Sequence, residues 1–206
     1  MKVLAFCDVH GDGNAMLAIE KKIAKHSPDL LICAGDITIF GNQQRMLIDW
    51  LNRQAVSSLI IPGNHEDAAE LERDCASKKQ ITYLHKKTLQ QNDYVFVGYG
   101  GDGFSRKDKS FEQFTASLDT EQFQERMILI LHGPPHNTTL DLIDGKHCGN
   151  SSYTQFICKY KPLLVIAGHL HENFGKRQML KRSLLLNPGP LGEIIDLGTV
   201  ARIINS

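Results

Sequence analysis

The sequence predicts an α/β fold in which helices cover either one mixed sheet or two sheets stacked face to face. Short apolar runs of strand length alternate with amphipathic stretches of helix length through most of the chain. Near the C-terminus the apolar runs are separated only by turn residues, which is typical of antiparallel strands. No Pro/Gly/Ser-rich linker divides the 206 residues, so we expect a single domain over residues 1–206.

The first third of the chain contains three predicted strands, each followed by a predicted helix. The strands are residues 2–7, 30–34 and 59–61, and the helices are residues 15–25, 43–54 and 68–76. Met16, Ile19 and Ile23 recur at helical spacing and would share one face of the first helix. Asn14 directly precedes that helix, and we predict that it caps the N-terminus.

The remainder continues the pattern and then changes. The predicted strands are residues 94–99, 127–131 and 163–167, and the predicted helices are residues 111–123 and 153–160. The glycine-bearing loop at residues 100–103 lacks the spacing of a phosphate-binding loop, which favours a plain turn. The last three runs, residues 184–186, 193–197 and 200–204, are predicted to form an antiparallel meander.

Composition excludes several kinds of partner. The chain has 23 basic and 23 acidic residues, and this balance argues against an extended nucleic acid as a partner. No apolar run approaches the roughly 20 residues that a membrane helix needs, and the apolar N-terminus meets Asp8 too early to form a signal-peptide core. The five cysteines form no CxxC pair, so we expect reduced thiols and a cytoplasmic location with no membrane partner.

Five predicted strands are each followed by a potential metal ligand. These side chains are Asp8 and His10, Asp36, Asn64 and His65, His132, and His169 and His171. Ligands of open α/β sheets usually bind at the carboxyl ends of strands, where all of these residues lie. Carboxylate, amide and neutral imidazole donors together suit Mn²⁺, Fe or Zn²⁺ better than Ca²⁺ or Cu(I). The sequence therefore predicts a metal centre at this edge.

Spacing within the motifs supports a shared centre. Asp8 and His10, like His169 and His171, are two positions apart, so each pair would lie on one side of an extended backbone. The carboxylate of Asp36 can bridge two ions, and two ions about 3.5–4 Å apart can clamp a phosphoryl group for in-line attack. Taken alone, Asp36 would be interpreted as a helix cap and His65 as a surface turn residue. The repeated pattern favours metal and catalytic roles instead.

The motifs D-x-H, G-D, G-N-H, H and G-H-x-H occur here in that order between Asp8 and His171. This ordered set resembles the calcineurin-like metallophosphoesterase superfamily. The segment 168–172 followed by Asn187-Pro188-Gly189 is similar to the small bacterial and archaeal phosphoesterases of that superfamily. The resemblance implies a two-sheet mixed β-sandwich flanked by helices. It also implies a metal-dependent phosphoric ester hydrolase, a phosphodiesterase or phosphatase.

The resemblance further implies two divalent ions, Mn²⁺ or Fe in the first place, with Zn²⁺ as an alternative. One ion would be held by Asp8, His10 and His171, the other by Asn64, His132 and His169, and Asp36 would bridge them. A bridging hydroxide would attack the phosphorus of a small phosphodiester or phosphomonoester, such as a cyclic nucleotide or a nucleotide. His65 would act beside the leaving group as a proton donor or by stabilising charge, a contribution of about 10²–10⁴-fold. Asp36 and His65 are thus the predicted catalytic residues.

Three further residues are candidate substrate contacts. His136 and His147 flank the long loop after the fourth motif, and loops of this kind carry function. Asn14 follows Gly11-Asp12-Gly13 here, where many relatives show His-Gly-Asn directly, so it is either a displaced substrate contact or only a cap.

Three alternatives compete with a small-substrate phosphoesterase. A non-catalytic scaffold on the same fold would have lost metal ligands, and none is missing here. Protein phosphatases of the superfamily carry an arginine after the second motif, which residues 35–41 lack. Nucleases of the superfamily add a capping domain, for which this chain has no room.

Overall fold

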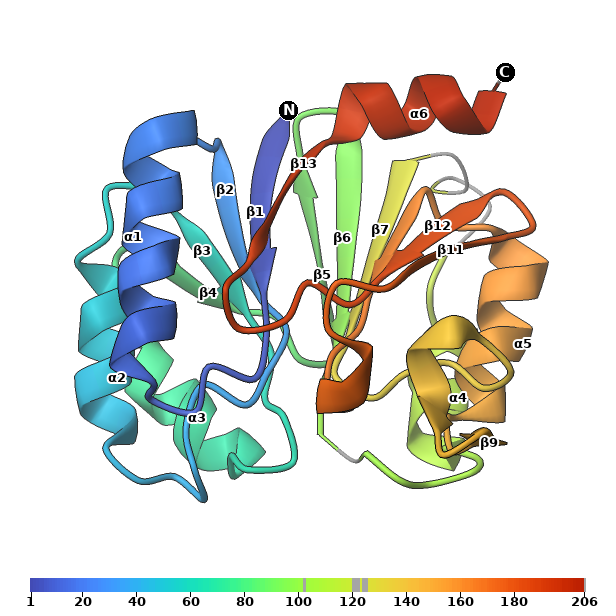
Figure 1. Cartoon of the computed structure of the whole chain (residues 1–206), viewed down its shortest axis with the longest axis horizontal. Helices are drawn as coiled ribbons and strands as arrows, with labels where there is room; N and C mark the ends of the chain where they lie inside the picture. Colours follow the sequence, from blue (N-terminus) through green and yellow to red (C-terminus); the bar gives the residue numbers. More distant parts are fainter. Residues whose placement is uncertain (102, 120–122, 124–125, 206) are drawn as a thin grey trace.

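The computed structural model describes residues 1–101, 103–119, 123 and 126–205. Two sheets pack face to face, and helices cover the outer face of each (Figure 1). The predicted two-sheet α/β sandwich with mixed sheets is therefore confirmed. No helix within the described ranges is long and apolar enough to cross a membrane.

The first sheet has the strand order β13-β1-β2-β3-β4. Its strands are β13 (Glu193–Asp196), β1 (Lys2–Phe6), β2 (Leu30–Cys33), β3 (Ser58–Ile60) and β4 (Ile81–Tyr83). Strands β1 to β4 are parallel, and β13 runs antiparallel to β1. The outer face is covered by the helices α1 (Gly13–His26), α2 (Gln44–Asn52) and α3 (Ala68–Cys75) (Figure 1). Each of these helices connects two neighbouring parallel strands, because parallel strands cannot be joined by a tight turn and need a crossover connection.

The second sheet has the order β11-β12-β10-β7-β6-β5. Its strands are β11 (Arg177–Leu180), β12 (Ser183–Leu186), β10 (Leu164–Ile166), β7 (Met127–Leu131), β6 (Tyr94–Tyr99) and β5 (Lys87–Gln91). The four central strands are parallel and the two edge strands antiparallel. The outer side carries α4 (Lys109–Ala116) and α5 (Ser151–Tyr160), together with a small hairpin of β8 (Leu142–Ile143) and β9 (Lys146–His147).

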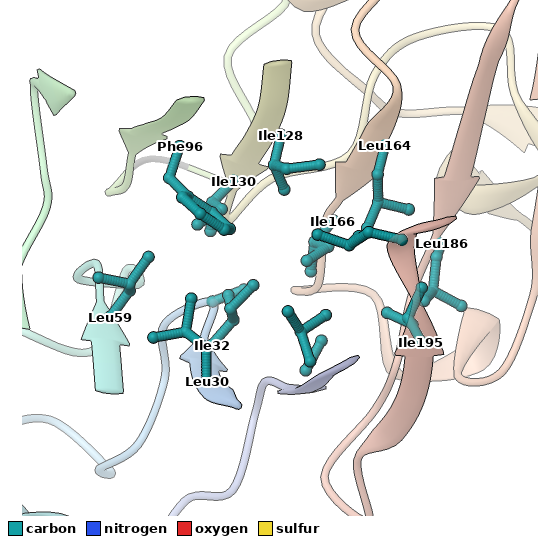
Figure 2. Close-up of a cluster of buried hydrophobic side chains, with 14 of the residues drawn as sticks. Leu30, Ile32, Leu59, Phe96, Ile128, Ile130, Leu164, Ile166, Leu186 and Ile195 are labelled. Carbon is teal, nitrogen blue, oxygen red and sulfur yellow. The ribbon is translucent and has the colours of Figure 1, made fainter. Parts of the chain in front are cut away.

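The core between the sheets explains why the strands are continuously apolar. In β1, Val3 and Ala5 pack between the sheets, whereas Leu4 and Phe6 pack beneath the helices. Successive side chains of a strand point to opposite faces, so a strand buried on both faces needs apolar residues at every position. Figure 2 shows the layer between the sheets, where Ile32 lies beside Leu30 and Leu59 of the first sheet and faces side chains of the second. Both faces of the central strands are thus fixed in the core, and only their ends are free to carry polar groups.

Helix α1 begins at Gly13, earlier than predicted, because Asp12 and not Asn14 is its cap. The backbone of Asp12 is extended, and its side chain accepts a hydrogen bond from the N–H of Asn14 at 2.8 Å. A short carboxylate at this position satisfies an amide that has no partner inside the helix. The prediction that Asn14 caps the helix is therefore wrong.

The predicted C-terminal meander is also wrong. Strand β12 lies in the second sheet, parallel to β10, whereas β13 lies in the first sheet. Residues 200–204 belong to a helix, α6 (Leu197–Asn205), rather than to a strand. The Asp196 side chain accepts the N–H of Thr199 at 2.9 Å, and the buried side chains of Leu197 and Val200 anchor the first turn in the core. Helical spacing of apolar contacts therefore prevails over the β-propensity of the segment.

Other boundaries differ more modestly from expectation. Helix α4 ends at Ala116, where Ser117 is the C-cap, so the predicted helix 111–123 is too long at its C-terminal end. Residues 120–122 and 124–125 of that prediction lie outside the described residues. The strands β4, β5 and β11 and the hairpin β8–β9 were not predicted, because their runs are short or largely polar.

Candidate metal centre

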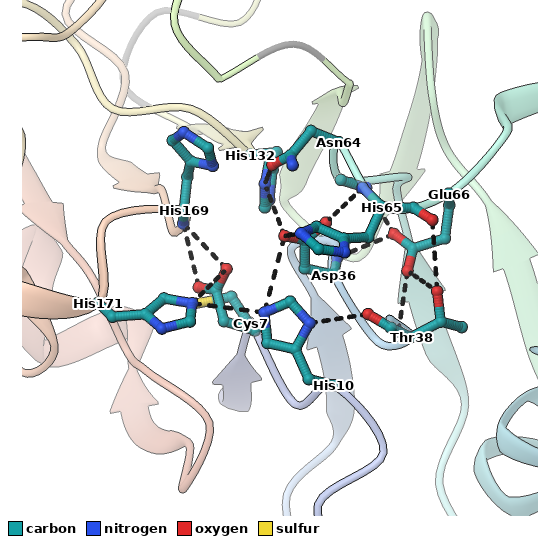
Figure 3. A network of polar contacts seen from close by, with 12 residues as sticks. Cys7, His10, Asp36, Thr38, Asn64, His65, Glu66, His132, His169 and His171 are labelled. Carbon is teal, nitrogen blue, oxygen red and sulfur yellow. Dashed lines mark hydrogen bonds and ion pairs between the residues drawn. The ribbon is translucent and has the colours of Figure 1, made fainter. Parts of the chain in front are cut away.

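The candidate ligands meet where the two sheets come together at the carboxyl ends of their strands (Figure 3). The first sheet supplies residues after β1, β2 and β3, and the second supplies residues after β7 and β10. Their ligand atoms form three overlapping groups, within each of which all atoms lie within 4.8 Å of one another. The groups are Asp8, His10 and His171; His10, Asp36 and His65; and Asp36, His132 and His169.

Asp36 lies at the middle of this arrangement. Its Oδ1 accepts the backbone N–H of His65 at 2.9 Å. Its Oδ2 lies 3.4 Å from Nε2 of His132, 3.8 Å from Nε2 of His10 and 3.9 Å from Nε2 of His65. One carboxylate oxygen is therefore fixed by the backbone while the other faces ring nitrogens on both sides, as a carboxylate between two cations requires.

Hydrogen bonds to carbonyls fix the tautomers of two histidines. Nδ1 of His10 lies 2.7 Å from the carbonyl oxygen of Thr38, and Nδ1 of His132 lies 3.0 Å from that of Ala34. A carbonyl can only accept, so Nδ1 carries the proton and the neutral ring presents the Nε2 lone pair to the centre. Histidines that ligate metals are held in this way by their second nitrogen.

The donor set fits a cation. Nε2 of His132 lies 3.0 Å from Oδ1 of Asn64, and two acceptors at this distance need a cation or a proton between them. In the metal-free chain burial lowers the pKa of His132, but its hydrogen bond and charge interaction with Asp36 outweigh burial and raise the pKa to about 9. The lone pairs that bind a proton here can also bind a metal cation. They belong to nitrogen and oxygen atoms, the kind of ligand that Mn²⁺, Fe and Zn²⁺ bind.

Left-handed backbone turns point the ligands into the centre. Asp8, His10, Asp36 and His169 have φ values of 53°, 49°, 51° and 71°. A residue with a side chain is uncommon in this region, and such conformations concentrate at functional sites. The expectation that an extended backbone brings each D-x-H or H-x-H pair together is therefore wrong, because sharp turns do so. Asp8 is further held by the N–H of His169, which donates to its two oxygens at 3.0 and 3.2 Å.

Glu66 holds the loops after β2 and β3 in place through hydrogen bonds. Its buried carboxylate accepts the backbone N–H groups of Asp36, Thr38 and Gly63 at 2.8–2.9 Å and the hydroxyl of Thr38 at 2.7 Å. The three bonds to Asp36 and Thr38 tie the loop after β2 to the loop after β3, and the bond to Gly63 fixes the second loop itself. Sequence reasoning did not single out Glu66. The available signal was its position directly after Asn64-His65, where a charged residue follows a buried strand and two candidate site residues.

Two glycines allow backbone to lie against the site. A Cβ on Gly63 would lie 1.9 Å from Oδ1 of Asp36, and a Cβ on Gly103 would lie 2.2 Å from the ring of His169. The loop around residues 100–103, expected to be a plain turn, therefore packs against a candidate ligand through Gly103. Residue 102 lies outside the described part of the chain.

His65 presents a proton to the rim of the centre. Its Nδ1 accepts the backbone N–H of Phe40 at 3.2 Å, so in the neutral ring the proton is on Nε2. That nitrogen is the one facing Oδ2 of Asp36 at 3.9 Å. The ring also lies edge-on to His10, with centroids 4.9 Å apart. His65 therefore combines a fixed orientation with a donor directed at the centre.

An open pocket of about 470 Å³ lies over the ligands. Its described lining residues are His10, Asp36, Ile39, Asn64, His65, Phe104, His169 and His171. His136, a predicted substrate contact, does not line it: its Nδ1 lies 3.3 Å from the buried carboxylate of Asp141, which His147 also contacts at 2.6 Å. Asn14 is exposed near the start of α1 and does not line it either. The structure thus brings the seven predicted ligands and His65 together, but not His136, His147 or Asn14.

Several proteins are similar to this chain in sequence. An uncharacterized protein of Methanocaldococcus jannaschii is 26% identical over 205 residues, covering 92% of this chain and 88% of its own. A probable glycerophosphodiester phosphodiesterase of Arcobacter nitrofigilis is 27% identical over 159 residues, 71% of this chain and 58% of its own. A probable cyclic nucleotide phosphodiesterase of Coxiella burnetii is 24% identical over 169 residues, 78% of this chain and 67% of its own.

The fold has a solved counterpart as well. The crystal structure of the protein TT1561 of Thermus thermophilus superposes with a TM-score of 0.78 at 17% identity, over 97% of this chain and 95% of that one. A sequence profile of the calcineurin-like phosphoesterases matches residues 1–173, a span that includes every candidate ligand described above. With the ligand motifs, the two-sheet fold and this match in agreement, the chain belongs to the calcineurin-like phosphoesterase family and is a hydrolase of phosphoric esters.

Proposed function

We propose that the protein hydrolyses a small phosphodiester or phosphomonoester with the help of two divalent metal ions. Asp8, His10 and His171 would hold one ion, Asn64, His132 and His169 the other, and Asp36 would bridge them. The observation that carries the proposal is the position of Asp36 Oδ2, which has Nε2 atoms of His10 and His132 on either side at 3.8 and 3.4 Å. The ions, when bound, would supply Lewis acidity and an activated water for in-line displacement.

The ionisation of Asp36 suits a bridging role. Burial raises the pKa of this carboxyl, but the hydrogen bond and charge of His132, followed by those of His65, hold it below its usual range. Asp36 is therefore a carboxylate at neutral pH. Since it sits between the two candidate ion positions, its negative charge would offset the repulsion between two cations.

His65 would serve the leaving group. Its Nε2–H is oriented by the bond between Nδ1 and the backbone of Phe40, and Nε2 lies 3.9 Å from Oδ2 of Asp36 in the lining of the pocket. A positioned donor of this kind contributes about 10²–10⁴-fold when the leaving oxygen needs a proton. The chain's own part in the reaction is thus to orient the phosphate and protonate the departing alcohol.

The donors and the pocket support the proposed choice of metal and substrate. Mixed nitrogen and oxygen ligands favour Mn²⁺ or Fe, with Zn²⁺ as an alternative. A pocket of about 470 Å³ suits a small phosphorylated molecule such as a cyclic nucleotide or a nucleotide, rather than extended nucleic acid or a membrane. The five free cysteines agree with a reducing compartment, and we propose the cytoplasm.

The test begins with metal-stripped protein. Reconstitution with Mn²⁺ should give close to two ions per chain by elemental analysis and hydrolysis of bis(4-nitrophenyl) phosphate or 4-nitrophenyl phosphate. Asp36→Ala should lose both the full ion count and the activity. A folded, metal-loaded wild type that is inert on mono- and diesters would contradict the proposal. A non-catalytic scaffold gains no support here, since every ligand position of the family motif is occupied by a competent side chain.

A further inference from the structure

Large apolar side chains flank the pocket beside the candidate ligands. Ile39 follows β2 and is 50% exposed, and Phe104 follows β6 and is 68% exposed, yet both line the pocket. Side chains of this size are more often buried, and a cluster of them at a concave site indicates a binding surface. Ile39 belongs to a loop of the first sheet and Phe104 to a loop of the second. The apolar surface therefore lies where the two sheets meet, as the candidate metal centre does.

The apolar groups adjoin the reacting region directly. The Phe104 ring lies edge-on to His169, with centroids 4.4 Å apart and planes at 72°. Phe40 packs on His65 with ring centroids 4.2 Å apart. His65 and His169 belong to two different groups of candidate ligand atoms, and Asp36 is the residue that both groups share. If His65 serves the leaving oxygen, Phe104 is adjacent to the ester group that stays on phosphorus.

The charges of the residues that line the pocket indicate the chemical class of the retained ester group. The described residues lining the pocket include neither Lys nor Arg. A second phosphate or a carboxylate on the substrate would therefore meet no cationic side chain among these described lining residues, which disfavours polyphosphorylated molecules. An uncharged planar ring, by contrast, can pack edge-on or offset against Phe104 and cover Ile39.

We propose, on the basis of the proposed function, that Phe104 and Ile39 form a subsite for an uncharged aromatic ring carried on the retained ester oxygen of a phosphodiester. The subsite would act by removing apolar surface of both partners from water. Burial of one ring face corresponds to about a tenfold gain in affinity.

Binding of non-hydrolysable acids tests this without turnover. Diphenylphosphinate and dimethylphosphinate carry the same single charge, and their P–C bonds resist hydrolysis. Calorimetry on the Mn²⁺-loaded protein should show diphenylphosphinate binding about tenfold more tightly. The preference should vanish in Phe104→Ala, shrink in Ile39→Ala and persist in Leu17→Ala, a matched control whose apolar side chain is 54% exposed on α1. The affinity for dimethylphosphinate should stay the same in all three variants.

Several results would overturn the subsite. Equal affinities for the two phosphinates in the wild type would do so, as would a preference that survives in both Phe104→Ala and Ile39→Ala. An equal loss of both affinities in Phe104→Ala would show that this residue acts only through His169. Failure of the proposed function looks different: the wild type would then bind neither phosphinate in a Mn²⁺-dependent way and would hydrolyse no ester.

Steady-state kinetics with a set of diesters would distinguish an aryl group from a nucleoside as the source of the ring. Methyl, phenyl and thymidine 5′ diesters of 4-nitrophenyl phosphate share one leaving group and differ only in the retained ester. A higher kcat/KM for the phenyl ester alone would identify an aryl group, and a higher value for the thymidine ester would identify a nucleoside. No advantage for either over the methyl ester would overturn the proposal.

Discussion

Glu66 accepts the backbone N–H of Asp36 at 2.9 Å through the same oxygen, Oε2, that accepts the N–H of Gly63 at 2.8 Å. A single buried oxygen thus links the loop that carries the central carboxylate to the loop that carries Asn64 and His65. Because Asp36 Oδ1 in turn accepts the N–H of His65, the two loops are joined in both directions. The position of the candidate catalytic groups thus depends on Glu66, which is not among the described residues that line the pocket.

Glu66→Gln should therefore weaken both fold and site. The amide would turn an –NH₂ toward backbone N–H groups that now donate to a carboxylate, leaving buried donors without acceptors. We expect a loss of about 2–4 kcal/mol in the free energy of unfolding, measured by urea denaturation. Glu70→Gln, at an exposed position of α3, is the control and should change stability by less than about 0.5 kcal/mol. Equal effects of the two substitutions would refute the role of Glu66.

Gly103→Ala should act on metal binding rather than on folding. The added Cβ would lie 2.2 Å from the ring of His169, which must then move away from its position in the centre. Displacement of a ligand in this way typically costs 10–100-fold in metal affinity, which competition with a chelating dye would measure. Gly13→Ala is the matched control, since a Cβ there meets nothing within 4 Å. Unchanged Mn²⁺ affinity in Gly103→Ala would show that the loop is not a support for His169.

The role of His65 is separable from its structural bonds. His65→Asn keeps an acceptor near Nδ1 for the N–H of Phe40 but removes the Nε2 proton. We expect kcat to fall by about 10²–10⁴-fold for diesters with an alkyl alcohol as leaving group. With 4-nitrophenolate, which is stable as an anion, the loss should be much smaller. The ratio of the two losses is the diagnostic, and equal losses for both leaving groups would argue against proton donation.

His85 should make stability depend on pH between about 4 and 6.5. Its Nδ1 accepts the N–H of Gly100 at 2.8 Å, and burial, assisted by the charge of Lys86, lowers its pKa to about 4. In the unfolded chain the ring takes up a proton near pH 6.5, whereas the folded chain does so only near pH 4. The unfolded state binds more protons in this window, so stability falls as the pH is lowered through it.

His85→Asn keeps an acceptor for Gly100 and has no proton to bind. Between pH 7 and pH 4 the free energy of unfolding of the variant should fall by about 1–2 kcal/mol less than that of the wild type. This figure is reduced to allow for the partial exposure of the ring. Urea midpoints of wild type and variant at several pH values give this difference directly. Parallel pH profiles for the two proteins would assign the dependence to other groups.

The strands of the core were predictable because each signal is local. A strand buried on both faces must be apolar throughout, and residues 127–131 and 163–167 show this without help from any other part of the chain. The polar residues at their ends then stand out. The ordered motifs from Asp8 to His171 were visible for the same reason.

What could not be predicted depends on distant contacts. Residues 200–204 are apolar and partly β-branched, and the bond of Asp196 to Thr199 and the packing of Leu197 and Val200 in the core favour a helix instead of a strand. Glu66 looks like an ordinary surface acid until three backbone amides from two loops surround it. His136 was predicted to contact substrate because it lies in a long loop, but its Nδ1 lies 3.3 Å from the carboxylate of Asp141 and it is not among the described residues that line the pocket.

The left-handed turns and the division of ligands between the sheets have a mechanical consequence. Asp8 and His169 are 161 positions apart, and each candidate ion would be held by side chains from both sheets. Metal loading would then act as a reversible cross-link between the N-terminal and C-terminal halves of the chain, comparable to a disulfide that a chelator can open. Stability should rise with free metal concentration by mass action, so the melting temperature of this protein would itself report the occupancy of its centre.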